Sequence, residues 1–124
     1  MRFVFDLAPS TVAPSQARAV ARGLAGDLRP EMLADLRIVV SELVANAVKY
    51  GPGGDIHVEL DVVSAGHVRG SVAERLDDAL CVTEPHIVEE PGANGGFGLR
   101  LVDGLTTDWG VGKDTTAVWF ELGG

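Results

Sequence analysis

The chain has 124 residues, a formal net charge of −8 and an apolar content of 46%. This length predicts one domain, residues 1–124, and the apolar content excludes intrinsic disorder because it can support a buried core. An acidic surface repels phosphate-rich partners, and no apolar run is long enough to span a bilayer, so we expect a cytoplasmic protein that binds neither nucleic acid nor membrane.

The first half of the chain predicts a strand followed by two helices. Apolar residues alternate over Arg2–Leu7, which is typical of a strand. Ser10–Pro14 has the chemistry of a helix start, a Ser or Thr cap followed by Pro, and this helix is expected to run to about Leu28. The second helix, Glu31 to Tyr50, has apolar residues at the 3.6-residue period and ends at a run of glycine and proline.

The second half predicts a hairpin, a long irregular loop, a third helix and two closing strands. Residues 75–95 show no periodicity and are long for a connection, which favours a functional or mobile segment. The order of elements predicts an α+β two-layer sandwich, with three helices on one face of a mixed, mostly antiparallel sheet. The remaining elements are expected at Ile56–Val63, His67–Glu74, Gly96–Leu105, Thr107–Val111 and Ala117–Leu122.

The second helix carries the first candidate site. Glu42, Asn46 and Lys49 are spaced four and three residues apart, which places them on one face, away from the apolar stripe of the helix. An amide oxygen is a suitable neutral ligand for Mg²⁺, and a carboxylate beside it can deprotonate a hydroxyl. The alternative is a solvated polar face with a local hydrogen bond between Glu42 and Asn46.

The second candidate is the glycine-rich run Gly92–Arg100, which enters the third helix. Glycines at a helix start expose backbone N–H groups at the positive end of the helix dipole, where phosphate can approach closely. The run is neither a Walker A loop nor a Rossmann fingerprint, because it lacks the spacing of each. Taken alone, it is more typical of a flexible hinge.

Together, the two motifs and the closing Thr-x-Val-x-Phe strand resemble the GHKL ATPases (gyrase, histidine-kinase and MutL type), and within them the anti-sigma-factor serine kinases. The resemblance implies binding of ATP and Mg²⁺, residues 75–95 as the ATP lid, and Glu42 as the general base toward a serine of a partner protein. It also implies roles in nucleotide binding for Asn46 (as the Mg²⁺ ligand), Lys49, Glu74, Gly95, Gly96, Phe97, Gly98, Leu99 and Thr116.

The sequence departs from the family where the adenine is held. Family members end the third strand with Asp followed by Gly-x-Gly, whereas this chain aligns Glu74, Leu76 and Asp78 with those positions. Glu74 keeps a hydrogen-bond acceptor but projects it farther by about one C–C bond, ~1.5 Å. Residues 74–90 also carry six acidic residues against Arg75 alone, so an inward-folded lid would repel a nucleotide.

Two functions therefore follow from the resemblance. The first is a Mg²⁺-dependent serine/threonine protein kinase of the anti-sigma-factor type, whose partner is a sigma factor or an anti-anti-sigma-type protein. The second is a nucleotide-impaired module of the same fold that regulates transcription through protein partners. Family members often form homodimers, and this sequence neither supports nor excludes one. Trp109 and Trp119 are expected in the core, and the three histidines show no metal-site spacing.

Overall fold

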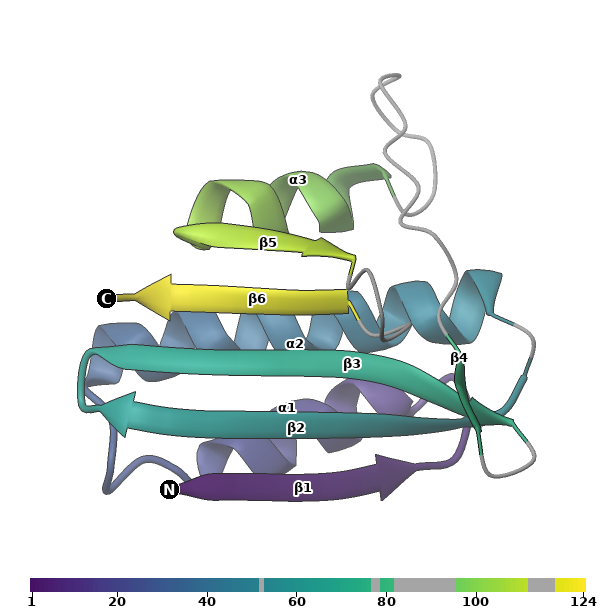
Figure 1. The fold of residues 1–124 in the computed structure, drawn as a ribbon, viewed down its shortest axis with the longest axis horizontal. Coiled ribbons are helices and arrows are strands. Elements are labelled where there is room, and N and C mark those ends of the chain that lie inside the picture. Colours follow the sequence, from purple (N-terminus) through teal and green to yellow (C-terminus); the bar gives the residue numbers. More distant parts are fainter. Residues whose placement is uncertain (52, 77–78, 82–95, 112–117) are drawn as a thin grey trace.

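The computed structural model describes residues 1–51, 53–76, 79–81, 96–111 and 118–124 (Figure 1). Three helices and six strands occur in these segments, and apart from one short additional strand their order agrees with the order that the sequence predicts. In chain order they are β1 (Arg2–Leu7), α1 (Ala13–Arg22), α2 (Pro30–Tyr50), β2 (Asp55–Ser64), β3 (His67–Leu76), β4 (Ala79–Cys81), α3 (Gly96–Leu105), β5 (Asp108–Val111) and β6 (Val118–Gly123).

The strands form one open sheet in the order β1-β2-β3-β6-β5, with β4 paired to the end of β3. Every pairing between the described strands is antiparallel, so the sheet is not mixed. The short strand β4 was not predicted, because its three residues lie in the segment that we expected to be irregular throughout. The rest of the expected lid, residues 77–78 and 82–95, lies outside the described residues.

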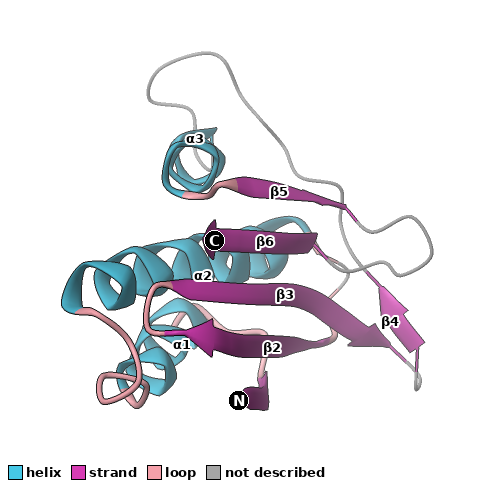
Figure 2. Cartoon of the chain, turned by 60° about the vertical axis from the view of Figure 1, so that its left-hand side comes forward, coloured by secondary structure: helices cyan, strands magenta, loops and turns pink. Residues whose placement is uncertain are grey.

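The helices cover one face of the sheet, and α2 lies at the centre of this layer (Figure 2). The face of α1 toward α2 is lined by Ala13, Ala17 and Ala21, which are fully buried and let the two helices approach closely. The apolar stripe of α2 then packs on the inward side chains of β2, β3 and β6. No helix in the described segments is long and apolar enough to cross a bilayer.

The sequence overestimates the length of α1. The helix ends at Arg22, not near Leu28, because a series of tight turns begins at Gly23. Hydrogen bonds between residues three positions apart close these turns, such as that from Leu24 N–H to Ala21 O. The predicted side-chain cap is also absent. Val12 occupies the cap position, and Ser10 contributes its backbone carbonyl, which accepts from Ala13 N–H.

One glycine on β3 makes room for the largest core side chain. Gly70 lies opposite Phe120 of β6, and a Cβ at Gly70 would stand 2.4 Å from Cζ of that ring. The Phe120 ring is 1% exposed and sits against Leu60 and Gly70. A side chain at position 70 would therefore displace the centre of the core.

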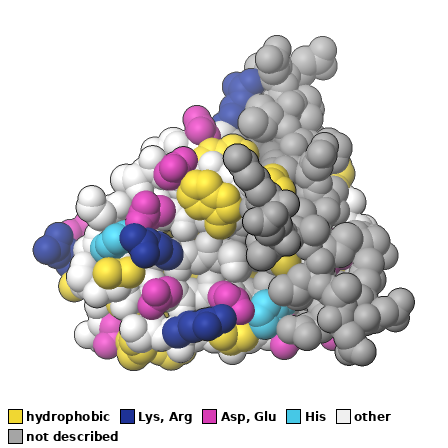
Figure 3. All heavy atoms as spheres, viewed as in Figure 1, with side chains coloured by type: hydrophobic (Ala, Val, Ile, Leu, Met, Phe, Trp, Pro, Cys, Tyr) yellow, Lys and Arg dark blue, Asp and Glu magenta, His cyan; other side chains and the backbone are white. Residues whose placement is uncertain are grey.

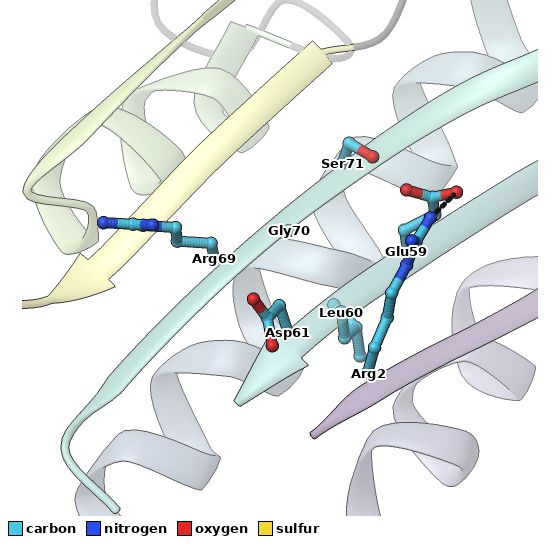
Figure 4. Close-up of a pocket in the computed structure, with 7 residues that line it drawn as sticks. All are labelled: Arg2, Glu59, Leu60, Asp61, Arg69, Gly70 and Ser71. Atoms are coloured by element: carbon cyan, nitrogen blue, oxygen red, sulfur yellow. Dashed lines mark hydrogen bonds and ion pairs between the residues drawn. The ribbon is translucent and has the colours of Figure 1, made fainter. Parts of the chain in front are cut away.

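The other face of the sheet is open and highly charged (Figure 3). Trp119 lies on it and is 36% exposed, so its predicted place in the core is wrong, whereas Trp109 packs partly buried against the core. A shallow hollow of about 350 Å³ crosses this face between Arg2 and Arg69 (Figure 4). Both arginines form ion pairs with carboxylates of the sheet, Arg2 with Glu59 and Arg69 with Glu121. Neither arginine therefore leaves an unpaired charge in the hollow.

Two carboxylates of this open face are stabilised in their charged form. Burial raises the pKa of Glu59, but hydrogen bonds from His57 and Arg2 outweigh this and leave the pKa below its ordinary value of 4.5. Hydrogen bonds from His67 and Arg69 lower the pKa of Glu121 in the same way. A carboxylate whose pKa is lower in the folded chain stabilises the fold above its unfolded pKa, and this contribution is lost as the pH falls through the folded value.

We therefore predict that the free energy of unfolding falls as the pH is lowered below about 4.5, and that Glu59→Gln makes this fall shallower. The expected difference at neutral pH is small, about 0.2–1 kcal/mol, because the Glu59 pair is partly exposed. Urea unfolding at several pH values measures it. Asp27→Asn, which removes an exposed carboxylate without an ion pair to any described residue, controls for the loss of charge. An unchanged pH dependence in Glu59→Gln would contradict the assignment.

Candidate functional site

The last two turns of α2 carry a buried amide without a partner. Asn46 is 8% exposed, and its Oδ1 atom makes no hydrogen bond. Leaving such an acceptor unsatisfied costs free energy, so a buried one marks a place where a donor or cation can bind. The other buried polar side chain of α2, Ser41, is satisfied because its hydroxyl donates to Ile38 O at 3.0 Å. Of the two buried polar residues of α2, only Asn46 therefore has an unsatisfied side chain, although the Nε atom of the half-buried Arg37, farther from the end of the helix, also lacks a partner.

Asn46 opens into a recess between α2 and the sheet. The recess is lined by residues of three elements, with Leu43, Asn46 and Ala47 from α2, Val72, Ala73 and Glu74 from β3, and Val118 from β6. We expected Asn46 to stand apart from the apolar stripe of α2, and this is wrong, because it shares the recess with Leu43 and Ala47. The recess has a free volume of about 10 Å³, close to what one water molecule needs.

Glu74 forms the far wall of the recess and is the most buried charged side chain in the described segments, at 1% exposure. Its Oε2 atom accepts hydrogen bonds from Gly53 N–H at 3.1 Å and Gly54 N–H at 3.2 Å. Its Oε1 atom has no partner. One carboxylate oxygen thus fixes the turn between α2 and β2, and the other remains available to a donor.

Gly51 is needed where α2 ends against this carboxylate. A Cβ at Gly51 would stand 1.3 Å from Oε1 of Glu74 and 2.4 Å from the carbonyl oxygen of Ala47. The backbone of Gly51 is extended, with φ −82° and ψ 170°, so the requirement is for space and not for an unusual conformation. The Gly-Pro-Gly-Gly run predicts the end of α2 from sequence. Its second role, to donate backbone N–H groups to Glu74, has no sequence pattern that could have predicted it.

The third helix brings a helix amino terminus to the same side of the molecule. α3 packs against α2 and begins at Gly96, at the end nearer the carboxyl-terminal half of α2 (Figure 1). Its first turn contains no acidic residue, so its own side chains do not neutralise the positive end of its dipole. Gly96 and Gly98 are in this first turn. The backbone N–H groups of the first turn of a helix have no partner within the helix.

The remaining predicted site residues are placed as follows. Glu42 is half-buried one turn before Asn46, and its carboxylate makes no hydrogen bond to another described residue. Lys49 is exposed, and its ammonium group lies 5.5 Å from the centre of the Tyr50 ring. Phe97 and Leu99 are in the first turn of α3. Gly95, Thr116 and Asp78 lie outside the described residues, and Leu76 is the last residue of β3.

The described residues fit the polar groups of a magnesium nucleotide. The free Oδ1 of Asn46 is a suitable Mg²⁺ ligand, and a magnesium ion bound with phosphates needs only one or two protein ligands. The α3 amino terminus suits phosphate, and Oε1 of Glu74 can accept one N–H donor. The recess itself holds no purine base at its present volume, so a base would have to widen it.

We predict that Gly51→Ala destabilises the protein by about 1–3 kcal/mol, because the new methyl group must displace the Glu74 carboxylate or the end of α2. Thermal and urea unfolding measure the change. Gly104→Ala is the matched control, since a Cβ at this helical glycine meets no atom within 4 Å and should stabilise α3 by up to about 1 kcal/mol. Equal stability of Gly51→Ala and wild type would show that Glu74 is not packed against this turn.

Comparisons with known proteins agree with this architecture. A family model described as the histidine kinase-like ATPase domain matches residues 6–122. Among solved structures, the crystal structure of the RsbU and RsbW domains of Rv1364c from Mycobacterium tuberculosis superimposes with a TM-score of 0.65 at 23% identity. The match covers 98% of this chain but only 31% of that one, and at this identity it shows the fold alone. No curated protein matches.

The family match spans nearly the whole chain, from the end of β1 into β6, and includes both helices of the candidate site. The fold predicted from the sequence is confirmed by the same element order and by the structural neighbour. The chain belongs to the histidine kinase-like ATPase domain family.

Proposed function

We propose that this chain binds ATP with Mg²⁺ beside Asn46 and transfers phosphate to a serine or threonine of a partner protein. The observation that carries the proposal is the buried, unpartnered Oδ1 of Asn46, one helical turn from Glu42, in a domain of an ATPase family. Asn46 would hold Mg²⁺, which offsets phosphate charge when bound. The amino terminus of α3 would hold phosphate through backbone N–H groups.

Glu42 is the residue we assign to proton transfer. It is half-buried, and its carboxylate makes no hydrogen bond to the other described residues, so it is free to accept a proton from a hydroxyl of the partner. Asn46 lies one turn farther along the same helix, so a substrate hydroxyl near Glu42 would also be near the bound phosphates. We further propose a sigma factor or an anti-anti-sigma-type protein as the partner, in the cytoplasm, on the resemblance alone.

A specific observation favours a second candidate, a protein-binding module with a weakened nucleotide site. Oε2 of Glu74 is already occupied by two glycine amides, and the recess admits about one water molecule. Binding a base here therefore costs the work of opening the recess. Losing one hydrogen bond to Glu74 makes the free energy of binding less favourable by about 1–3 kcal/mol. Each 1.4 kcal/mol corresponds to a tenfold change in the dissociation constant.

Calorimetry with Mg-ATP separates the two candidates. We expect saturable binding by the wild-type chain, and at least about tenfold weaker binding by Asn46→Ala, because the variant loses the cation ligand. Ser41→Ala is the matched control, since it removes a buried polar group of α2 that is already satisfied within the helix. No heat at millimolar Mg-ATP would sink the ATP-binding proposal and favour the protein-binding module, whereas equal binding by Asn46→Ala would remove Asn46 from the role of Mg²⁺ ligand.

The kinase step has its own prediction. Glu42→Gln keeps the size of the side chain but cannot accept a proton, so nucleotide affinity should change little while phosphate transfer to the partner falls by about 10²–10⁴-fold. Radiolabelled ATP and a purified candidate partner measure the transfer. Full phosphate transfer by Glu42→Gln would remove Glu42 from the role of base without affecting the binding proposal.

A further inference from the structure

Two buried oxygens line the recess between α2 and the sheet. Asn46 and Glu74 are 8% and 1% exposed, and among the described residues neither Oδ1 of Asn46 nor Oε1 of Glu74 has a hydrogen-bond partner. The recess has a free volume of about 10 Å³, which is room for one water molecule. Both oxygens are acceptors, so a molecule that satisfies them must donate two hydrogens, as water can. The recess therefore has the size and the chemistry of a water site.

The walls of this recess belong to the core. Val72 lies opposite Val58 of β2 and Val118 of β6, and all three side chains are at most 4% exposed. Leu43 lines the recess from the helix layer and is 2% exposed. A cavity that binds benzene, a ring smaller than a purine, has a volume of about 150 Å³. A base could therefore enter only by separating α2 from the sheet, which would disrupt the close packing of the core.

Glu74 is held in place by the turn after α2. Its Oε2 atom accepts hydrogen bonds from Gly53 and Gly54, and its backbone lies between Ile56 of β2 and Cys81 of β4. Gly53 has a φ of +97°, a left-handed conformation that favours glycine. The turn, the end of β3 and β4 lie at the same end of the sheet (Figure 1). Turning the carboxylate toward a base would release both glycine amides, so its position serves the fold.

We propose that the site recognises the magnesium-bound phosphate chain of its ligand and not the base. The inference rests on the proposed function and narrows it, because it names the ligand class: a nucleoside triphosphate of any base, or inorganic tripolyphosphate, as the magnesium complex. The groups that suit the phosphate half are already in position, Oδ1 of Asn46 for the cation and the amino terminus of α3 for phosphate. The base would stay outside the recess.

Glu74 would sense the cation through the water in the recess. This water would donate one hydrogen to Oδ1 of Asn46 and the other to Oε1 of Glu74. A cation bound by the same Asn46 oxygen would turn the water and so change its bond to Glu74. Gly53 and Gly54 donate to this carboxylate, so their N–H groups should respond to the cation even when the ligand has no base.

Ligands that share the phosphate chain but differ in the base test the proposal. UTP carries a smaller ring than ATP and no amino group. We expect calorimetry of the wild-type chain to give dissociation constants for Mg-ATP and Mg-UTP within about threefold of each other, whereas a hydrogen bond to the adenine would separate them by about 5–150-fold. Magnesium tripolyphosphate should compete with Mg-ATP, and adenosine should not bind at millimolar concentration.

The NMR signals of the glycine turn give a readout that depends on neither affinity nor activity. During a titration with magnesium tripolyphosphate, the amide signals of Gly53 and Gly54 and the side-chain amide signal of Asn46 should shift and saturate together. If Glu74 instead accepted an N–H from the base, Gly53 and Gly54 would shift with Mg-ATP and stay in place with tripolyphosphate.

Glu74→Gln tests the role of the carboxylate. The two glycine N–H groups keep the glutamine oxygen on their side, so its NH₂ group faces the recess and a donor replaces the acceptor. The substitution should change the affinities for Mg-ATP and magnesium tripolyphosphate by the same factor, to within about threefold. Glu59→Gln is the matched control, because Glu59 also has two hydrogen-bond partners but lies on the open face, and it should change neither affinity. Circular dichroism checks that each variant is folded, and the wild-type comparisons need no variant.

The outcomes separate this inference from the proposed function. Mg-ATP binding at least about tenfold tighter than Mg-UTP binding would overturn the inference and leave the proposed function standing. Glycine signals that shift with Mg-ATP but not with tripolyphosphate, or a loss in Glu74→Gln that is confined to Mg-ATP, would do the same. Absence of binding by every magnesium complex would overturn the proposed function and this inference with it.

Discussion

The carboxylate of Glu74 is buried where three parts of the chain meet. It comes from β3, accepts hydrogen bonds from the turn that starts β2, and packs against the glycine that ends α2. A buried charge of this kind is tolerated only when it is well hydrogen-bonded, so the glycine turn and the carboxylate require each other. Because one carboxylate oxygen remains free, the same group that orders this corner of the fold also presents an acceptor to the recess below Asn46.

The arrangement places different demands on the two halves of a nucleotide. Phosphates and Mg²⁺ would meet groups that already have the required chemistry, the Asn46 amide oxygen and the amino terminus of α3. A base would have to enter a recess that holds about one water molecule and compete for a carboxylate already bound to two amides. The energetic cost of nucleotide binding therefore lies on the base side, where the sequence also departs from its family.

The sequence predicts the long amphipathic helix, the hairpin and α3 well, because their apolar period is regular and glycine marks their ends. It fails at α1, where Leu24 and Leu28 are buried as a helix would bury them but belong to turns. Trp119 lies on the open face, because alternation along β6 gives the inward positions to Val118 and Phe120. The site residues on α2 follow from spacing, whereas the bond between Glu74 and Gly53 joins residues 21 positions apart and has no local sequence pattern.

The central claim is that Asn46, Glu74 and the glycine turn form the floor of a nucleotide site. Two-dimensional ¹H–¹⁵N NMR during a titration with Mg-ATP tests it directly, because Gly53 and Gly54 report on Glu74 and the side-chain amide of Asn46 reports on the cation. The account predicts that these three signals shift together and saturate with one dissociation constant. It is contradicted if all three keep their positions up to millimolar Mg-ATP while the protein remains folded.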